Sequence, residues 1–428
     1  MAYDLTKEFI ETLVNQPIVS FEVNAGSKQG DNVQGVLKAV TVETAAGETL
    51  NLVHKTMSAD PAARYFIVDA QTFRIETEFY TKIAPAMEAV VKSRSPANYQ
   101  LPIPKFYAGF NNDNDDYLTM DDLRPQGYRM ADKFVGLNFN EVSVFLKALG
   151  RFHAFSYFFL KQEGEKLFDT VLPRISRPFF DEPGKTEEFA MMFGGATDYT
   201  VEIASKKFPE IEESLRSKLK RDTHGFQTSQ KTDSKFFPLL IHADLWVNNM
   251  MFKYDQEGKA VDVKFIDFQL TRRGNIFEEL LYFFFTSTTP EFRRNYLYSA
   301  LEVYYQSFTS NLKNLQCPLP IGFTRGFLID SFNECILDTY AFMGFAIPMQ
   351  LGENPGIVKS DDFEKPPEGH GGPPQGDGAP PAFNMADIPV EIRTAAFVNS
   401  NRAQLENSPK ALQRFYDITE EMIQLKLL

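Results

Sequence analysis

The stretch 240–268 constrains the fold of this chain more than any other part of it. It contains His242, Asp244 and Asn249 in the pattern H-x-D-x-x-x-x-N, and Asp267 follows further along. Between Asn249 and Asp267, two apolar-rich segments flank a turn-forming D-Q-E-G-K sequence, which predicts a short hairpin. We therefore expect a loop that carries an aspartate and an asparagine, and then a hairpin whose second strand ends at another aspartate.

These three side chains are the groups that phosphoryl transfer requires. One carboxylate must orient and deprotonate the attacking hydroxyl, while an amide oxygen and a second carboxylate hold the hard cations that bridge the phosphates. The same order is found in the catalytic and metal-binding loops of kinases. Taken singly, Asp244 has an alternative interpretation as a turn residue or helix cap, and Asp267 as a common strand-end carboxylate. Their combination with Asn249 favours kinase-like chemistry.

Hydrophobic periodicity divides the chain into two parts. The first part has strand-like segments at 21–57 and 117–120, with a helix-like segment, 66–92, between them. From about residue 140 onward the pattern is mostly helical, and a chain of 428 residues is too long for a single hydrophobic core. We therefore predict a small β-rich lobe over 1–123 and a larger, mainly helical lobe over 124–428.

A segment near the C-terminus has a composition that does not support a packed core. Residues 366–381 contain six prolines and five glycines. Such a stretch buries too little apolar surface to offset the entropy of ordering it. We predict a disordered loop at about 353–384.

Charge and cysteine content exclude several classes of protein. The chain has 44 Lys and Arg against 57 Asp and Glu, a net charge of −13, which would repel a nucleic acid backbone. Its two cysteines, Cys317 and Cys335, lack the spacing of a disulfide framework or a zinc site. The N-terminus lacks the features of a signal peptide, and no apolar run is long enough to span a membrane. We expect a cytoplasmic protein with no nucleic acid, membrane or obligate protein partner.

The sequences around these motifs resemble a known family. H-A-D-L-W-V-N-N-M-M-F-K-Y, then V-K-F-I-D-F-Q-L and L-L-Y-F, are similar to the ecdysteroid kinase-like (CHK kinase-like) family, within the aminoglycoside phosphotransferase and choline kinase group. The resemblance extends over nearly the whole chain, to about residue 350. It implies an α+β, two-lobed protein kinase-like fold and an enzyme that uses ATP and Mg²⁺ to phosphorylate a hydroxyl of a small molecule.

The resemblance also implies a role for each motif residue. Asp244 would be the catalytic base, Asn249 and Asp267 the magnesium ligands, and His242 a scaffold residue of the catalytic loop. Two sequence positions depart from the family pattern. Ala243 replaces the usual glycine and would be strained if it needs a positive φ. Glu279 replaces the usual aspartate and keeps its charge on a longer side chain.

On the nucleotide side, the resemblance implies that Lys55 contacts the α and β phosphates and pairs with Glu76. Glu78 is the alternative partner of Lys55, but the spacing of the two glutamates from Phe73 favours Glu76. Without the family context, Lys55 is equally well interpreted as a solvated lysine at the end of a strand. His153 is expected to pack inside a helix of the larger lobe and to have no direct catalytic role.

Two further segments are implied as nucleotide contacts. The adenine would bind the backbone of an interlobe hinge, whose residues are Met120, Asp121, Asp122 and Leu123. The alternative for this hinge is a plain exit from a strand. The glycine-containing loop 26–32, with Gly30 and Asn32, would approach the phosphates, and its alternative is an ordinary hairpin turn.

The acceptor is the least determined part of the prediction. Asp267 and Phe268 are followed by glutamine, and no Ala-Pro-Glu follows, so a protein kinase is disfavoured. A catalytically silent, ligand-binding kinase fold remains an alternative, as does a choline or aminoglycoside type of kinase. We expect a hydroxylated, largely apolar acceptor such as a steroid or a xenobiotic alcohol, because the predicted pocket helices are rich in apolar side chains. These side chains are Phe283, Phe284, Phe285, Tyr340, Phe342, Met343 and Phe345, of which most are expected to belong to the hydrophobic core and the rest to line the pocket.

Overall fold

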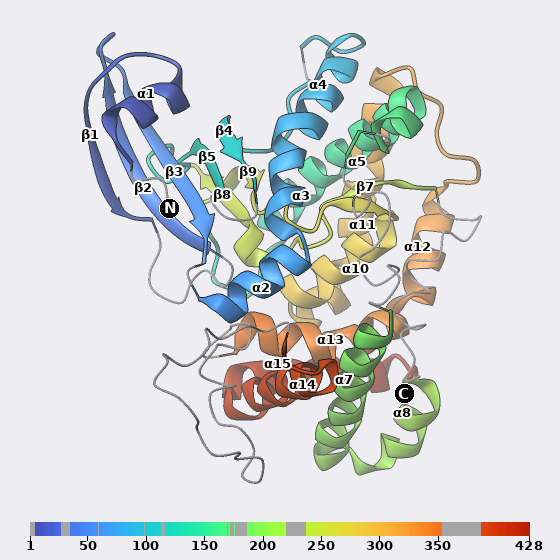
Figure 1. Cartoon of the computed structure of the whole chain (residues 1–428). Coiled ribbons are helices and arrows are strands. Elements are labelled where there is room, and N and C mark those ends of the chain that lie inside the picture. Colours follow the sequence, from blue (N-terminus) through green and yellow to red (C-terminus); the bar gives the residue numbers. More distant parts are fainter. Residues whose placement is uncertain are drawn as a thin grey trace, which may run out of the picture.

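A computed structural model shows a β-rich N-terminal part joined to a larger helical part (Figure 1). The structure describes residues 5–26, 35–58, 60–97, 99–112, 116–168, 170–171, 175, 186–219, 237–352 and 387–428. The predicted disordered loop, 353–384, lies outside these residues. The class is α+β, as the sequence predicted.

The N-terminal part is built on an antiparallel five-stranded sheet in the order β1-β2-β3-β5-β4. Its strands are β1 (Ile18–Ala25), β2 (Gly35–Thr44), β3 (Thr49–Met57), β4 (Phe106–Phe110) and β5 (Tyr117–Asp121), and helix α1 (Lys7–Val14) packs near β1. Ile10, Val40, Val42 and Leu52 form a small separate core under this helix. The alternation of buried and exposed residues along β2 explains why the sheet has one buried face.

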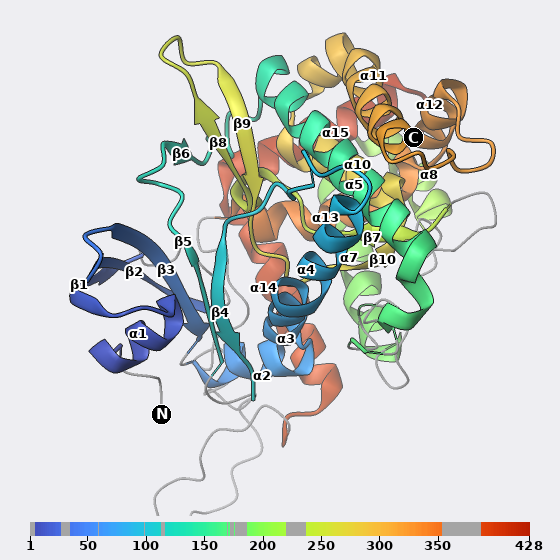
Figure 2. The ribbon, with the colours of Figure 1, turned by 90° about the horizontal axis from the view of Figure 1, so that it is seen from above.

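Three helices and a π-helical turn follow β3, where the sequence predicted one helix over 66–92. They are α2 (Pro61–Asp69), α3 (Thr72–Glu78), the turn Phe79–Ile83 and α4 (Ala84–Lys92). The break between α2 and α3 occurs because Gln71 adopts a left-handed conformation with φ of 54°. Figure 2 shows α3 and α4 between the sheet and the helices of the larger part, and α4 packs on α5.

The larger part combines helices with two small sheets. Its helices are α5 (Phe139–Phe168), α7 (Thr186–Lys207), α8 (Glu212–Lys218), α10 (Ile276–Ser287), α11 (Pro290–Asn314), α12 (Arg325–Glu334), α13 (Ile336–Leu351), α14 (Val390–Asn407) and α15 (Pro409–Gln424). Its strands are β6 (Tyr128–Arg129), β7 (Leu239–Ile241), β8 (Met250–Tyr254), β9 (Ala260–Phe265) and β10 (Arg272–Gly274). Strands β8 and β9 pair as the antiparallel hairpin that the sequence predicted.

Two groups of helices surround the predicted catalytic segment. Helices α5 and α11 pack along each other, and α7, α13, α14 and α15 gather at the bottom of Figure 1. One continuous hydrophobic core runs from α3 and α4 into this helical part. Within the described part of the chain, no helix combines the length and the apolar character needed to cross a bilayer. The segment 239–267 therefore lies between the sheet-bearing part and a rigid helical base.

Candidate active site

Lys55, on β3, lies at the junction of the two parts. Its Nζ is 2.7 Å from Glu76 Oε2 on α3 and 2.7 Å from Asp267 Oδ1, which follows β9. Burial alone would lower the pKa of Lys55, but the neighbouring carboxylates of Asp267 and Glu76 raise it above its ordinary value. The lysine therefore stays charged and joins two segments that are distant in the sequence.

The structure also separates the two candidate glutamates of α3. Glu76 is 1% exposed and faces Lys55, whereas Glu78 Oε1 accepts a hydrogen bond from Lys82 at 2.6 Å. Two residues correspond to about 200° of helix rotation, so both cannot face the same side. The spacing from Phe73 thus identified the glutamate that meets the lysine.

Asp267 owes its position to an unusual backbone conformation and to the ring that follows it. Its φ is 68°, in the left-handed region. Phe268 is fully buried and stacks on Phe79 of the π-helical turn, with ring centroids 3.7 Å apart and planes 5° from parallel. Anchoring of Phe268 fixes the preceding peptide, and the Asp267 carboxylate consequently reaches Lys55.

The loop after β7 brings Asp244 and Asn249 together. Asn249 Nδ2 donates to the main-chain oxygen of Asp244 at 2.8 Å and to its Oδ2 at 2.9 Å. An amide nitrogen carries two hydrogens, and both are directed at Asp244. The side-chain oxygen of Asn249 therefore takes no part in holding Asp244.

The second oxygen of Asp244 contacts a residue that the sequence did not single out. The phenol of Tyr282, on α10, donates to Asp244 Oδ1 at 2.7 Å. Burial raises the pKa of Asp244 to about 7, although the hydrogen bonds from Tyr282 and Asn249 act in the opposite direction. A signal for Tyr282 was present, since it is the one hydroxyl-bearing residue in the apolar run L-L-Y-F-F-F.

Ala243 adopts the conformation in which an alanine is strained. Its φ is 68°, and its N–H donates to Glu279 Oε1 at 2.7 Å. The other oxygen, Glu279 Oε2, lies 2.6 Å from Nε2 of His153, whose Nδ1 lies 2.8 Å from the Tyr304 hydroxyl. All three supporting side chains are buried. The two departures from the family pattern therefore meet in one hydrogen bond, and His153 supports the loop from behind.

His242 also holds the loop from within. Its Nε2 is 2.9 Å from the main-chain oxygen of Ile266, and its ring centroid is 4.4 Å from that of Phe268. Burial lowers the pKa of His242, so the neutral ring is favoured. This arrangement connects the loop of Asp244 to the segment of Asp267.

The hinge residues lie at the edge of the sheet-bearing part. The amides of Asp121 and Asp122 donate at 2.8 Å to the main-chain oxygens of Lys105 and Asn51. Met120 and Leu123 are buried. The carboxylate of Asp122 accepts hydrogen bonds from Arg124, which also donates to the Gly26 oxygen at 2.8 Å. The amides of Asp121 and Asp122 are thus engaged within the protein, while Gly30 and Asn32 lie outside the described residues.

A cavity of about 50 Å³ is lined in part by Ala243, which precedes Asp244, and by Tyr282, which hydrogen-bonds it. It is lined by Ile241, Ala243, Arg272, Glu278, Tyr282, Asp338, Thr339 and Phe342. Of the seven side chains expected to form an apolar pocket, only Phe342 lines this cavity. Five of the others are at most 2% exposed and belong to the core, namely Phe283, Phe284, Phe285, Tyr340 and Met343. Helix α10 is buried on nearly all sides, and most of the seven side chains belong to the core, as expected.

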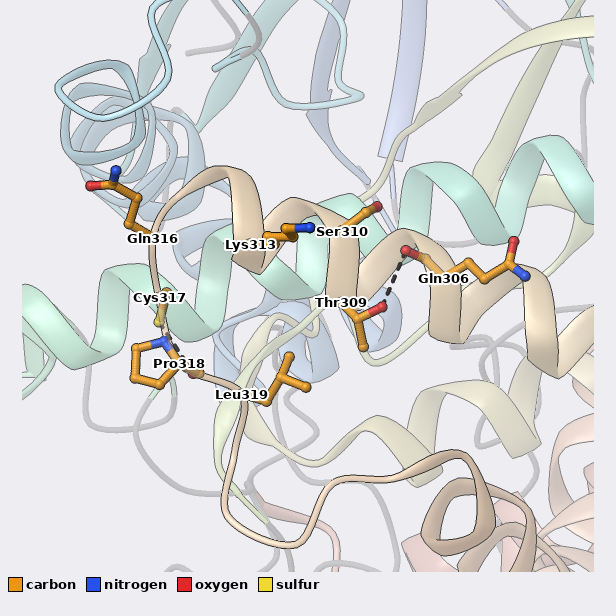
Figure 3. Close-up of a pocket in the computed structure, with 8 residues that line it drawn as sticks. All are labelled: Gln306, Thr309, Ser310, Lys313, Gln316, Cys317, Pro318 and Leu319. Atoms are coloured by element: carbon orange, nitrogen blue, oxygen red, sulfur yellow. Dashed lines mark hydrogen bonds between the residues drawn. The ribbon is translucent and has the colours of Figure 1, made fainter.

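A larger hollow, of about 850 Å³, lies at the end of α11 (Figure 3). Its lining comes from Gln306 to Leu319 on α11 and the loop that follows, and it includes none of the candidate site residues. Among the residues that the structure describes, no group of three or more His, Cys, Asp or Glu side chains is arranged to hold a metal. The pair formed by Asn249 and Asp267 is therefore the candidate for cation binding.

Comparison with known proteins found one matching family and several solved structures of low similarity. Three similar solved structures are all complexes with GDP. A point mutant of aminoglycoside 2'-phosphotransferase-IIIa has a TM-score of 0.39 and 12% identity, over 79% of this chain and 90% of that chain. APH(2")-IIIa with kanamycin has a TM-score of 0.37 and 13% identity, over 81% of this chain and 92% of that chain, and the wild-type 2'-phosphotransferase has a TM-score of 0.38 and 13% identity, over 80% of this chain and 91% of that chain. No curated protein matches significantly in sequence. A sequence model of the ecdysteroid kinase-like family matches residues 29–317, which include Lys55, Asp244 and Asp267. Since that match covers more than half of the chain, the protein belongs to the ecdysteroid kinase-like family.

Proposed function

We propose that this protein is a Mg-ATP-dependent phosphotransferase that phosphorylates a hydroxyl of a small, largely apolar molecule. The observation that carries the proposal is the contact of Lys55 with both Glu76 and Asp267, each at 2.7 Å, beside a loop in which Asn249 holds Asp244. Lysine, carboxylate, amide and a second carboxylate are the groups that kinase-type transfer uses.

Asp244 is the proposed base. A carboxylate whose pKa is raised to about 7 by burial accepts a proton from an alcohol more readily than an ordinary aspartate does, because its basicity is higher. The acceptor oxygen forms a bond to the γ-phosphorus, the bond from that phosphorus to the bridging oxygen of ADP breaks, and the hydroxyl proton passes to Asp244.

The proposed cation ligands are the side-chain oxygen of Asn249 and the carboxylate of Asp267. Their chemistry fits Mg²⁺, which prefers oxygen ligands and takes few of them from the protein when phosphates supply the rest. A bound cation would neutralise phosphate charge. Lys55, whose pKa is raised by its acidic neighbours, is the proposed partner of the α and β phosphates.

The cavity beside Asp244 is the proposed acceptor end of the site. The rings of Tyr282 and Phe342, with centroids 5.9 Å apart, and the side chain of Ile241 give it apolar walls. The rival acceptor is a cation of the choline or aminoglycoside type, which the carboxylates of Glu278 and Asp338 in the lining favour. Glu278, however, is paired with Arg272 at 2.8 Å. Half of the acidic lining is therefore neutralised, and the apolar acceptor is preferred.

A direct assay tests this proposal. The wild-type protein is incubated with Mg-ATP and either a panel of hydroxysteroids and other apolar alcohols, or choline and aminoglycosides, and mass spectrometry detects an added phosphate. Asp244→Asn serves as the control for contaminating kinases. Transfer to an apolar alcohol supports the proposal, whereas transfer to the cations alone overturns the acceptor class. If no acceptor and no water is phosphorylated, the chain is a ligand-binding member of its family.

A further inference from the structure

Tyr282 helps to fix the orientation of the Asp244 carboxylate through a hydrogen bond. Asn249 Nδ2 donates a hydrogen bond to Asp244 Oδ2 at 2.9 Å, and the Tyr282 hydroxyl donates one to Asp244 Oδ1 at 2.7 Å. The two contacts on the two oxygens fix both the direction and the rotation of the carboxylate plane. Asn249 belongs to the same loop as Asp244, but Tyr282 belongs to α10, which is built into the hydrophobic core.

The Tyr282 hydroxyl is itself held from a second helix. Gln350, near the end of α13, donates from Nε2 to the phenolic oxygen at 2.6 Å, and the Gln350 side chain is buried. Because its oxygen accepts from Gln350, the phenol must direct its only hydrogen at Asp244. The main-chain oxygen of Gln350 accepts from Lys133 Nζ at 2.8 Å, which fastens this end of α13.

We propose that Tyr282 is a positioning residue, which aims the Asp244 carboxylate at the acceptor hydroxyl, and that Gln350 acts through Tyr282. Each carboxylate oxygen has two lone-pair sites, so Oδ1 accepts the acceptor hydroxyl while it keeps the bond from Tyr282. The ring of Tyr282 also lines the acceptor cavity, and the same residue therefore links the acceptor site to the base. This proposal rests on the proposed function.

Tyr199 offers a matched control, because its hydroxyl also donates to one oxygen and accepts from one side-chain amide, but its partners are Gly344 and Asn401 and not Asp244. It donates to the Gly344 main-chain oxygen at 2.9 Å and accepts from Asn401 Nδ2 at 2.9 Å. Tyr199 is also buried, at 2% exposed. Tyr199→Phe therefore measures what the loss of a doubly bonded buried hydroxyl does to stability alone.

The test is a double-mutant cycle on turnover. ADP formation from Mg-ATP is measured with water as the acceptor, and again with one panel alcohol that the wild type phosphorylates. Tyr282→Phe should lower kcat about 10- to 100-fold and leave the KM for ATP unchanged, because misplacement of a reacting group costs rate and not nucleotide binding. Gln350→Leu should lower kcat less, and it should add nothing in the Tyr282→Phe background. Tyr199→Phe should keep the wild-type kcat.

The outcomes distinguish a positioning role of Tyr282 from a merely structural one. If Tyr282→Phe keeps kcat within twofold of wild type, or if it and Tyr199→Phe reduce kcat and thermal midpoint alike, Tyr282 has only a structural role and the proposal is wrong. If the reductions in kcat from Tyr282→Phe and Gln350→Leu multiply in the double variant, Gln350 does not act through Tyr282. If the wild type transfers phosphate neither to water nor to an alcohol, the proposed function fails, and the assignment of Tyr282 fails with it.

Discussion

The two carboxylates of the site are held in opposite ways. Asp267 meets the ammonium group of Lys55 at 2.7 Å, whereas Asp244 is held by two neutral groups, the Asn249 amide and the Tyr282 phenol. A cationic partner strongly favours the charged form of a carboxylate, and neutral donors in a buried setting favour it much less. The difference is consistent with our proposal that the lysine side binds the phosphates and that Asp244 on the loop side accepts a proton.

The supports behind the two sides differ as well. The lysine side depends on contacts between distant segments, because β3, α3 and the end of β9 must meet for Lys55 to have both partners. The loop side rests on α5 and α10, through His153 and Glu279. Relative movement of the two parts would thus disturb phosphate binding before it disturbed the base.

The strongest test of this division is Asp244→Asn. We expect turnover to fall about 10²- to 10⁴-fold, since a general base contributes on that scale, while the affinity for Mg-ATP and the thermal midpoint stay near their wild-type values. Steady-state kinetics and calorimetry measure the two quantities separately. A large loss of nucleotide affinity in this variant would show that the two sides are not separable.

Asp267→Asn should have the reverse profile. Removal of its charge takes away a proposed cation ligand and one partner of Lys55, so the affinity for Mg-ATP should fall about tenfold or more, in the range of the ~1.5–3 kcal/mol of a charge-assisted bond. Calorimetry with and without Mg²⁺ checks this. The wild type should lose most of its nucleotide affinity in EDTA. Equal affinities of wild type and variant in the presence of Mg²⁺ would remove Asp267 from the cation site.

Glu279→Gln probes the support of the loop side. The glutamine keeps the shape but loses the charge that accepts from both Ala243 N–H and His153, so one buried hydrogen-bonding group is left poorly matched. We expect the free energy of unfolding to fall by about 1–3 kcal/mol, the usual cost of such a group. Denaturant unfolding measures it. Stability unchanged from the wild type would mean that the loop is held by other contacts, and His242 would be the first to examine.

The smallest effect is expected from Ala243→Gly. Relief of the positive φ at an alanine is worth about 1–2 kcal/mol, and the greater backbone freedom of glycine in the unfolded chain offsets about 0.5–1 kcal/mol of it. The net result should be stabilisation of up to about 1 kcal/mol, measured by the shift in the denaturation midpoint. As a matched control, Ala148→Gly removes a methyl group inside α5, where the backbone is helical, and should destabilise. Destabilisation by Ala243→Gly would show that its methyl group is needed for packing.

Much of this architecture was predictable because its signals are local. The hairpin 250–265 follows from alternation around a turn, and the helical segments follow from their spacing. The break at Gln71, which splits the helix predicted over 66–92, was not foreseen, because a backbone turn between two helix-like patterns leaves the hydrophobic period almost intact. The sequence could not say which side chains of the aromatic run line a pocket, since periodicity does not distinguish a pocket wall from a core.

The sequence by itself determined which chemical groups the site contains and their order along the chain: Lys55, Glu76, Asp244, Asn249 and Asp267. For Asp244, Asn249 and Asp267 it did so because the spacing within a loop and a hairpin restricts where short side chains reach, whereas Lys55 and Glu76 followed from the family resemblance. Only the tertiary structure decided that Tyr282 and Gln350 complete the surroundings of Asp244, and that Glu279 bonds the strained Ala243. These contacts join residues 36 to 68 positions apart. No local pattern records them, because they exist only once α10 and α13 have packed around the loop.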